Sequence, residues 1–266
     1  MFKTRLISGM ILVAAALVLI ITGGEILLAA SCAVSLIGMY ELYRVYQMEQ
    51  TAAAVIGYAA AVIFYSDLYL HWLPDPMLYV MGLLIVLLAV YVLAYPKYHA
   101  SQITAVFFGV FYVAVMLSCI WQTRMMAQGA YIVWLIFLCS WGCDTCAYCV
   151  GVKFGKHKMS PVLSPKKSVE GAIGGLAGTF LLTALYAYAF RGQMHISAAQ
   201  ILILAAISTV GALISMIGDL AASAIKRNYE IKDYGTLIPG HGGILDRFDS
   251  VIFTAPVILY LARYLL

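Results

Sequence analysis

Long apolar segments recur along the whole chain, and polar residues fall mostly between them. Each run approaches the roughly 20 residues that a helix needs to cross a bilayer. The runs do not alternate between polar and apolar residues, as the strands of a membrane barrel do. The pattern predicts nine transmembrane helices, at residues 6–23, 26–44, 52–72, 77–95, 102–122, 130–150, 170–190, 199–220 and 248–265.

Composition supports this reading. Hydrophobic residues make up 64% of the chain and its mean hydropathy is +0.95, values typical of a polytopic, all-α membrane protein surrounded by lipid. The six cysteines lie in apolar spans, which argues against a secreted disulfide framework. No soluble basic domain is present, so we expect no nucleic-acid partner despite the net charge of +4.

The distribution of Lys and Arg predicts the orientation. With a cytoplasmic N-terminus, 13 of these residues, Lys3 and Arg5 among them, lie inside and 3 lie outside. Inside segments are the ones enriched in Lys and Arg. We therefore expect both charged loops, residues 151–169 and 221–247, to be cytoplasmic. The expected location is the inner or plasma membrane of a bacterial-type cell.

The charged residues divide the chain into two regions. Residues 1–125 are apolar spans with short connections, whereas residues 126–266 carry three charged clusters at predicted membrane boundaries. The densest stretch, residues 223–249, holds eight of the 28 charged residues in 27 positions. Ionisable residues near a bilayer tend to mark a site. The chemistry is therefore expected in the second region.

The first cluster combines a carboxylate inside a span with a basic loop. Asp144 is the only charged residue between Arg124 and Lys153, and it is either a protonated or lysine-paired structural residue or part of a site. Lys166 and Lys167 precede Ser168, a predicted N-cap. A helix N-terminus flanked by lysines suits a phosphate group.

Small residues in this region have a simpler interpretation. Cysteines at 143, 146 and 149 briefly resemble an iron–sulfur run, but a fourth Cys and the following Pro are missing. Packing against a neighbouring helix explains them better, and glycines at 171, 174, 175 and 178 likewise predict a close helix–helix seam. Residues 151–157 are not a Walker A loop, because the glycine spacing is one residue short.

The second and third clusters place acids and bases at the ends of the last two spans. If the helix continues past its apolar run, Asp219, Ser223 and Lys226 share one face. Asp246 and Asp249 share a face at the start of the final helix. Each pattern has an alternative: an Asp–Lys helix pair in the first case, and stabilisation of the helix dipole in the second. His241, among glycines, is either a loop residue or a phosphate contact.

Together these residues predict phosphoryl or nucleotidyl transfer. Carboxylates can bind Mg²⁺ through oxygen, and cations neutralise phosphate charge in the transition state. The residues that the predicted topology gathers are four aspartates and at least five cations: Asp144, Asp219, Asp246, Asp249, Lys166, Lys167, Lys226, Arg227 and Lys232.

The order of residues 223–249 closely resembles the signature of phosphatidate cytidylyltransferases, the CDP-diacylglycerol synthases. The segment 164–171 and the start Lys3-Thr-Arg5 also resemble that family. The residues that carry the longer match are Ser223, Lys226, Arg227, Lys232, Asp233, Pro239, His241, Gly242, Gly243, Asp246, Arg247 and Asp249.

The resemblance implies a nucleotidyltransferase that joins CTP to phosphatidic acid in phospholipid biosynthesis and releases pyrophosphate. It also implies Mg²⁺, alone or with a second cation, and a homodimer. The implied catalytic residues are Asp219, Asp246, Lys226 and His241. The implied metal ligands are Asp144, Asp219, Asp246 and Asp249. The implied substrate-binding residues are Lys166, Lys167, Ser168, Ser223, Arg227, Lys232, Asp233, Gly242, Gly243 and Arg247.

Two other functions use the same residues differently. A CTP-dependent lipid or polyprenol kinase would transfer the γ-phosphate. An ion-coupled transporter would carry its ion on Asp144 and Asp219, although we find none of the internal repeats that transporters often show. The identity of the lipid product separates the three.

Overall fold

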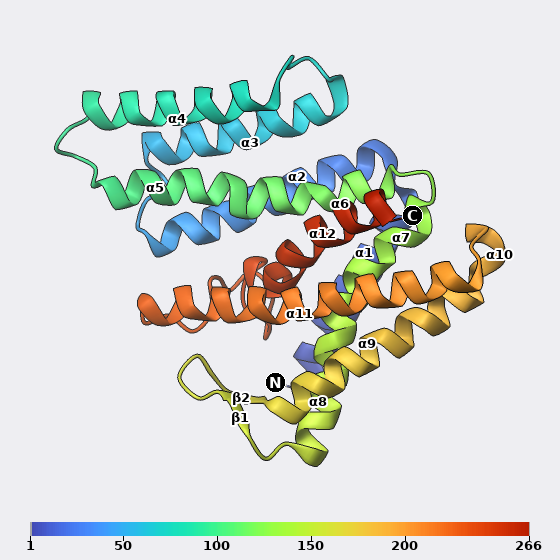
Figure 1. Cartoon of the computed structure of the whole chain (residues 1–266). Coiled ribbons are helices and arrows are strands. Elements are labelled where there is room, and N and C mark those ends of the chain that lie inside the picture. Colours follow the sequence, from blue (N-terminus) through green and yellow to red (C-terminus); the bar gives the residue numbers. More distant parts are fainter. Residues whose placement is uncertain (1, 266) are drawn as a thin grey trace.

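A computed structural model gives the architecture shown in Figure 1. It describes the backbone of residues 2–265 and the side chains of residues 7–265. The side chains of Lys3 and Arg5 therefore lie outside the described residues. The first four helices are α1 (Phe2–Thr22), α2 (Gly24–Val45), α3 (Ala52–Leu70) and α4 (Pro76–Leu93).

Two long helices follow, and each is interrupted by a π-helical segment. The first consists of α5 (Ala100–Gly109), η1 (Val110–Val115) and α6 (Met116–Arg124). The second consists of α7 (Gly129–Phe137), η2 (Leu138–Gly142) and α8 (Cys143–Phe154). Such π segments are often found at functional sites. Here η2 ends immediately before Cys143 and Asp144.

The last third of the chain holds a hairpin and the longest helix. Strands β1 (Lys158–Ser160) and β2 (Ser164–Ser168) pair antiparallel, within a segment that the sequence predicted only as a loop. The remaining helices are α9 (Val169–Ala189), α10 (Arg191–Met194), α11 (Ala198–Asn228) and α12 (Leu245–Leu265).

The all-α membrane class is confirmed. Among the described residues, eight helices are long and apolar enough to span a bilayer, and a shorter apolar helix covers Ile7–Thr22. The count of nine spans and the side of the N-terminus stay predictions. Helix α11 continues to Asn228, beyond the predicted end of the eighth span at residue 220. The charged loop after it is correspondingly shorter, at residues 229–244.

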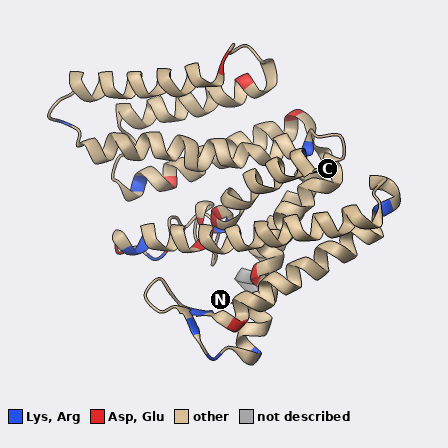
Figure 2. Cartoon of the chain, viewed as in Figure 1, with Lys and Arg blue, Asp and Glu red and all other residues tan. Residues whose placement is uncertain are grey.

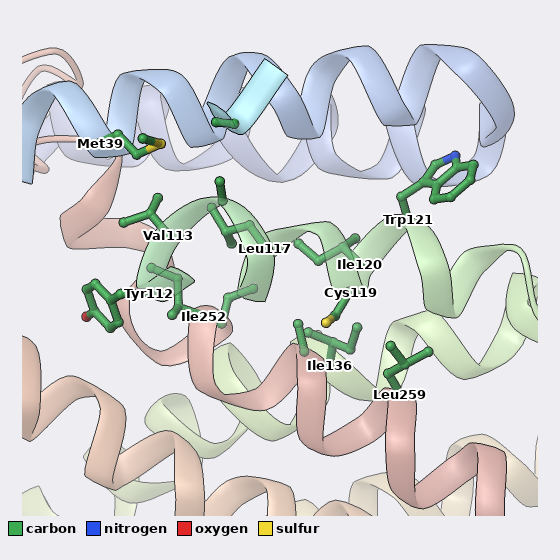
Figure 3. Close-up of a cluster of buried hydrophobic side chains, with 14 of the residues drawn as sticks. Met39, Tyr112, Val113, Leu117, Cys119, Ile120, Trp121, Ile136, Ile252 and Leu259 are labelled. Carbon is green, nitrogen blue, oxygen red and sulfur yellow. The ribbon is translucent and has the colours of Figure 1, made fainter. Parts of the chain in front are cut away.

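One core joins the two predicted regions. Met39 of α2, Leu117 of α6 and Ile252 of α12 belong to the same buried cluster, and Figure 3 shows side chains of these helices meeting. Helix α9 packs against α8 and α11, and α11 packs against α12. The division at residue 125 stays a prediction about where the chemistry lies.

The predicted glycine seam is confirmed, and it lies between α8 and α9. A Cβ at Gly174 would collide with the Val150 side chain, and one at Gly178 would collide with Cys146. A Cβ at Gly171 would meet the backbone of Ala147. The close approach places the start of α9 beside Ala147 and Gly151, toward the end of α8. Among the described cysteines none forms a disulfide.

Substitution in this seam should separate packing from helix propensity. Gly174→Ala should destabilise the protein by about 1–3 kcal/mol through overpacking, seen as a lower melting temperature in detergent. The control is Gly82→Ala in α4, where no atom lies within 4 Å of the added Cβ. Alanine there should be neutral or slightly stabilising. Equal melting temperatures for the two variants would contradict the seam.

Candidate active site

The candidate site lies at the end of the bundle that carries the hairpin and the 229–244 loop. Figure 2 shows charged residues of both signs beside the hairpin, at the end of α11 and at the start of α12. Because α11 continues past Asp219, the expectation that Asp219, Ser223 and Lys226 share a helix face is confirmed. Their side chains are all partly buried.

Lys167, the last but one residue of β2, reaches into a group of carboxylates. Its ammonium pairs with the Asp219 carboxylate and also interacts electrostatically with Asp144 and Asp249. Burial of the ammonium acts to lower the pKa of Lys167. The three carboxylates outweigh burial and raise that pKa above its usual value. Lys167 therefore stays charged. The structure thus brings Lys167 together with Asp144, Asp219 and Asp249.

A cavity of about 570 Å³ opens beside this group. Its basic side is formed by hairpin lysines, and its other walls are formed by α8, α9 and α11, whose lining residues are mostly apolar apart from Asp144 and Asp219. Such a cavity can hold a phosphate group next to an acyl chain. The residues that line it are Asp144, Ala147, Tyr148, Gly151, Val152, Lys158, Met159, Ser164, Lys166, Lys167, Ser168, Gly171, Ala172, Met216 and Asp219.

The start of α9 fixes one edge of the cavity. Ser168 is the N-cap, as predicted, and its hydroxyl accepts a hydrogen bond from the Gly171 N–H at 3.1 Å. The Glu170 carboxylate accepts the N–H groups of Lys156 and His157 at 3.0 and 3.2 Å. It also pairs with Nδ1 of His157 at 2.5 Å. The hairpin is thus attached to the first turn of α9.

Asp246 organises the neighbouring loop. Its Oδ1 accepts from Nζ of Lys226 at 2.8 Å. Its Oδ2 accepts the N–H groups of Tyr234 and Gly243 at 2.7 and 2.9 Å. Gly242 has a left-handed φ of +87°, and an added Cβ would lie 2.8 Å from Oδ2 of Asp246. Asp246 therefore has a loop-organising role that the sequence did not predict, and its role as a metal ligand stays a prediction.

Asp249 lies one turn further along α12 and is buried. Its Oδ1 accepts the Ser250 N–H at 2.7 Å, and the carboxylate interacts electrostatically with Asp219, Lys226 and Asp144. Asp249 therefore belongs to the same charge cluster as Lys167, although it is on a different helix from Asp219.

The other predicted residues are placed less centrally. Nδ1 of His241 is hydrogen-bonded to the Ser8 hydroxyl at 2.8 Å, so this residue contacts α1. The Arg247 guanidinium interacts electrostatically with Asp144. Three predicted residues are exposed at the end of α11 or in the loop: Arg227, Lys232 and Asp233.

Two residues of the first region reach the site without having been predicted there. Glu41 of α2 accepts the N–H groups of Ile244 and Leu245 at the start of α12. Tyr112 of η1 is 4% exposed, and its hydroxyl interacts electrostatically with Asp249 and Asp219. That hydroxyl is buried without a hydrogen-bond partner in the described part of the chain. For Glu41 the available signal was a carboxylate inside an apolar span.

The donor set suits a hard cation in its chemistry. Within the described residues, no three His, Cys, Asp or Glu side chains form a ready metal-binding group. However, Asp144, Asp219 and Asp249 interact electrostatically with one another, and carboxylate oxygens are what Mg²⁺ prefers. The Lys167 ammonium sits among them. A cation bound by these acids would therefore compete with Lys167.

Comparison with known proteins gives one consistent result. A family model described as the cytidylyltransferase family matches residues 3–265. The phosphatidate cytidylyltransferase of Staphylococcus aureus strain COL is 32% identical over 265 residues, which cover 96% of this chain and 97% of that protein. The one from Thermotoga maritima is 31% identical over 260 residues, covering 96% and 94%. The chain is thus similar to both along almost its whole length.

The contacts of Asp246 predict strong coupling to Lys226. Asp246→Asn should cost about 1–3 kcal/mol of stability, because an amide cannot satisfy all three donors at once. Lys226→Met should also destabilise the protein, since it leaves a buried carboxylate short of its cation. In the double variant the fall in melting temperature should be smaller than the sum of the two single effects. Additive effects would show that the pair is not coupled.

Proposed function

The chain belongs to the cytidylyltransferase family, and we propose that it is an integral-membrane phosphatidate cytidylyltransferase. It joins CTP and phosphatidic acid into CDP-diacylglycerol and releases pyrophosphate. The observation that carries this proposal is the match to relatives of that name over 96% of the chain. The apolar spans agree with a lipid substrate.

The two parts of the site suit the two substrates. The cavity beside Lys166 and Lys167 has apolar walls, so we assign it to phosphatidic acid, with the lysines facing the lipid phosphate. The loop around His241, with Lys226 at the end of α11 and Lys232 in the loop itself, is assigned to the triphosphate of CTP. Lys167 lines the cavity and also interacts electrostatically with Asp249 of α12, which follows the loop.

The reaction requires that the charges of the two phosphate groups are neutralised and that their reacting atoms are aligned. An oxygen of the lipid phosphate attacks the α-phosphorus of CTP, and the bond to the β-phosphate breaks to release pyrophosphate. Two anions must approach each other, so the lysine ammonium groups lower their repulsion. The residues that would hold Mg²⁺ are Asp144, Asp219 and Asp249, with Asp246 beside them. Bound there, the ion would supply further positive charge to the phosphates.

The distribution of charge supports the proposed orientation. The excess of Lys and Arg on the hairpin side supports a cytoplasmic site in the inner or plasma membrane of a bacterial-type cell. CTP would reach the site from the cytoplasm, and phosphatidic acid from the adjoining leaflet. The proposed homodimer rests only on the resemblance to the family.

Product analysis tests the proposed function directly. Purified protein given CTP labelled in the cytidine, Mg²⁺ and phosphatidic acid should produce a cytidine-labelled lipid and an equal amount of pyrophosphate. A parallel reaction receives a polyprenol in place of phosphatidic acid. Release of CDP with a phosphorylated polyprenol would instead support a kinase. No labelled lipid from phosphatidic acid would overturn the proposal.

Metal dependence should be traceable to Asp219. Activity should disappear with excess EDTA and return with Mg²⁺. The variant Asp219→Asn should need a higher Mg²⁺ concentration for half-maximal rate and should turn over roughly 10²-fold more slowly. The control is Asp75→Asn, because Asp75 only caps α4 and Asn caps equally well. An unchanged Mg²⁺ requirement in Asp219→Asn would remove Asp219 from the metal site.

A further inference from the structure

Glu41 is a buried carboxylate in the last two turns of α2, and its side chain reaches a segment 200 residues away along the chain. It is 4% exposed. Its Oε1 accepts the N–H of Ile244 at 3.0 Å, and its Oε2 accepts the N–H of Leu245 at 2.8 Å. These two amides open α12. Glu41 therefore supplies, from another helix, the cap that the start of α12 requires.

A charged carboxylate at position 41 is favourable only because it caps the start of α12. A carboxylate at a helix N-terminus is stabilised by the helix dipole and by the unpaired N–H groups. Against this, burial of a charge is expensive, and Glu41 also repels the nearby Asp246 carboxylate. An apolar side chain would avoid the repulsion but leave both amides without an acceptor. A glutamate at position 41 therefore suits the loop, because its carboxylate accepts both amides.

The loop is built around this carboxylate. A Cβ added at Gly235 or at Gly243 would overlap the Glu41 carboxylate, so both glycines leave room for it. One turn further along α2, Nη2 of Arg44 donates to the Tyr234 carbonyl at 2.5 Å. Helix α2 thus contacts the chain between α11 and α12 in two places, at residues 234–235 and at residues 243–245.

We propose that Glu41 is a positioning residue for cytidylyl transfer. It fixes the first turn of α12, and with it Asp246 and Asp249, relative to Lys226 on α11. It does not touch substrate; it acts through the backbone of residues 243–245. The inference rests on the proposed function for its kinetic readout, but the contact itself can be measured without activity.

The first test replaces the charge with a neutral group of the same shape. In Glu41→Gln we expect kcat to fall at least about tenfold, with a smaller change in the KM for CTP. The amides in a peptide covering residues 240–248 should exchange with deuterium at least about tenfold faster. The matched control is Glu25→Gln, because Glu25 lies at the other end of α2, is exposed and pairs with Tyr69. It should change neither readout.

The second test approaches the contact from the loop. Gly243→Ala should reproduce the loss of kcat and the faster exchange, because its methyl group displaces Glu41. The double variant Glu41→Ala with Gly243→Ala should be no worse than Glu41→Ala alone. This test does not need Glu41→Gln to be well folded. Melting temperatures of all variants show whether a loss of kcat reflects global unfolding.

The outcomes are distinct. Wild-type kcat and wild-type amide exchange in Glu41→Gln or in Gly243→Ala would overturn the positioning role. Faster exchange at 240–248 with unchanged kcat would also overturn it, since the contact would then be structural only. If the wild-type protein makes no cytidine-labelled lipid, the proposed function fails. In that case the amide exchange alone decides whether Glu41 holds the loop.

Discussion

Charges that are buried or partly buried at this end of the bundle need a partner, and that constraint organises the site. Three contacts meet it: Lys226 with Asp246, Lys167 with Asp219, and Glu41 with two backbone amides. An ion left alone in such a setting would cost several kcal/mol. Because the partners come from α2, β2, α11 and α12, satisfying the charges also fixes four separate segments against one another. Site and fold are stabilised by the same contacts.

The arrangement also explains how an apolar bundle can carry polar chemistry. The π segment η2 ends just before Cys143 and Asp144, and η1 contributes the buried Tyr112 close to Asp249. The glycine seam lets α9 start close to α8, which brings the hairpin lysines over Asp144 and Asp219. On the other side, Asp246 of α12 holds the 229–244 loop through the N–H groups of Tyr234 and Gly243, and it binds Lys226 of α11. One substrate can then approach through lipid and the other through water.

The apolar pattern predicted the spans to within a few residues, except where charge extends a helix. Residues 221–228 were assigned to a charged loop because Lys226, Arg227 and Asn228 interrupt the apolar pattern, yet Lys226 is helical and pairs with Asp246. The hairpin was not predicted because two strands this short carry too little alternation to be seen. Asp246 was expected near phosphate or metal, but its three hydrogen bonds depend on Tyr234 and Gly243, whose positions no local pattern reveals. Glu41 was visible as a charge in a span, whereas its partners lie 200 residues away.

The two substrates are assigned to different parts of the site, and photochemical labelling can locate each of them. The wild-type protein would be irradiated with a photoreactive CTP analogue, or with a phosphatidic acid carrying a photoreactive group near its phosphate, and the labelled peptides mapped. We expect nucleotide labelling within residues 226–249 and lipid labelling within residues 147–172, each prevented by the unmodified substrate. Lipid labelling in the 229–244 loop, or nucleotide labelling confined to the 147–172 cavity, would contradict it.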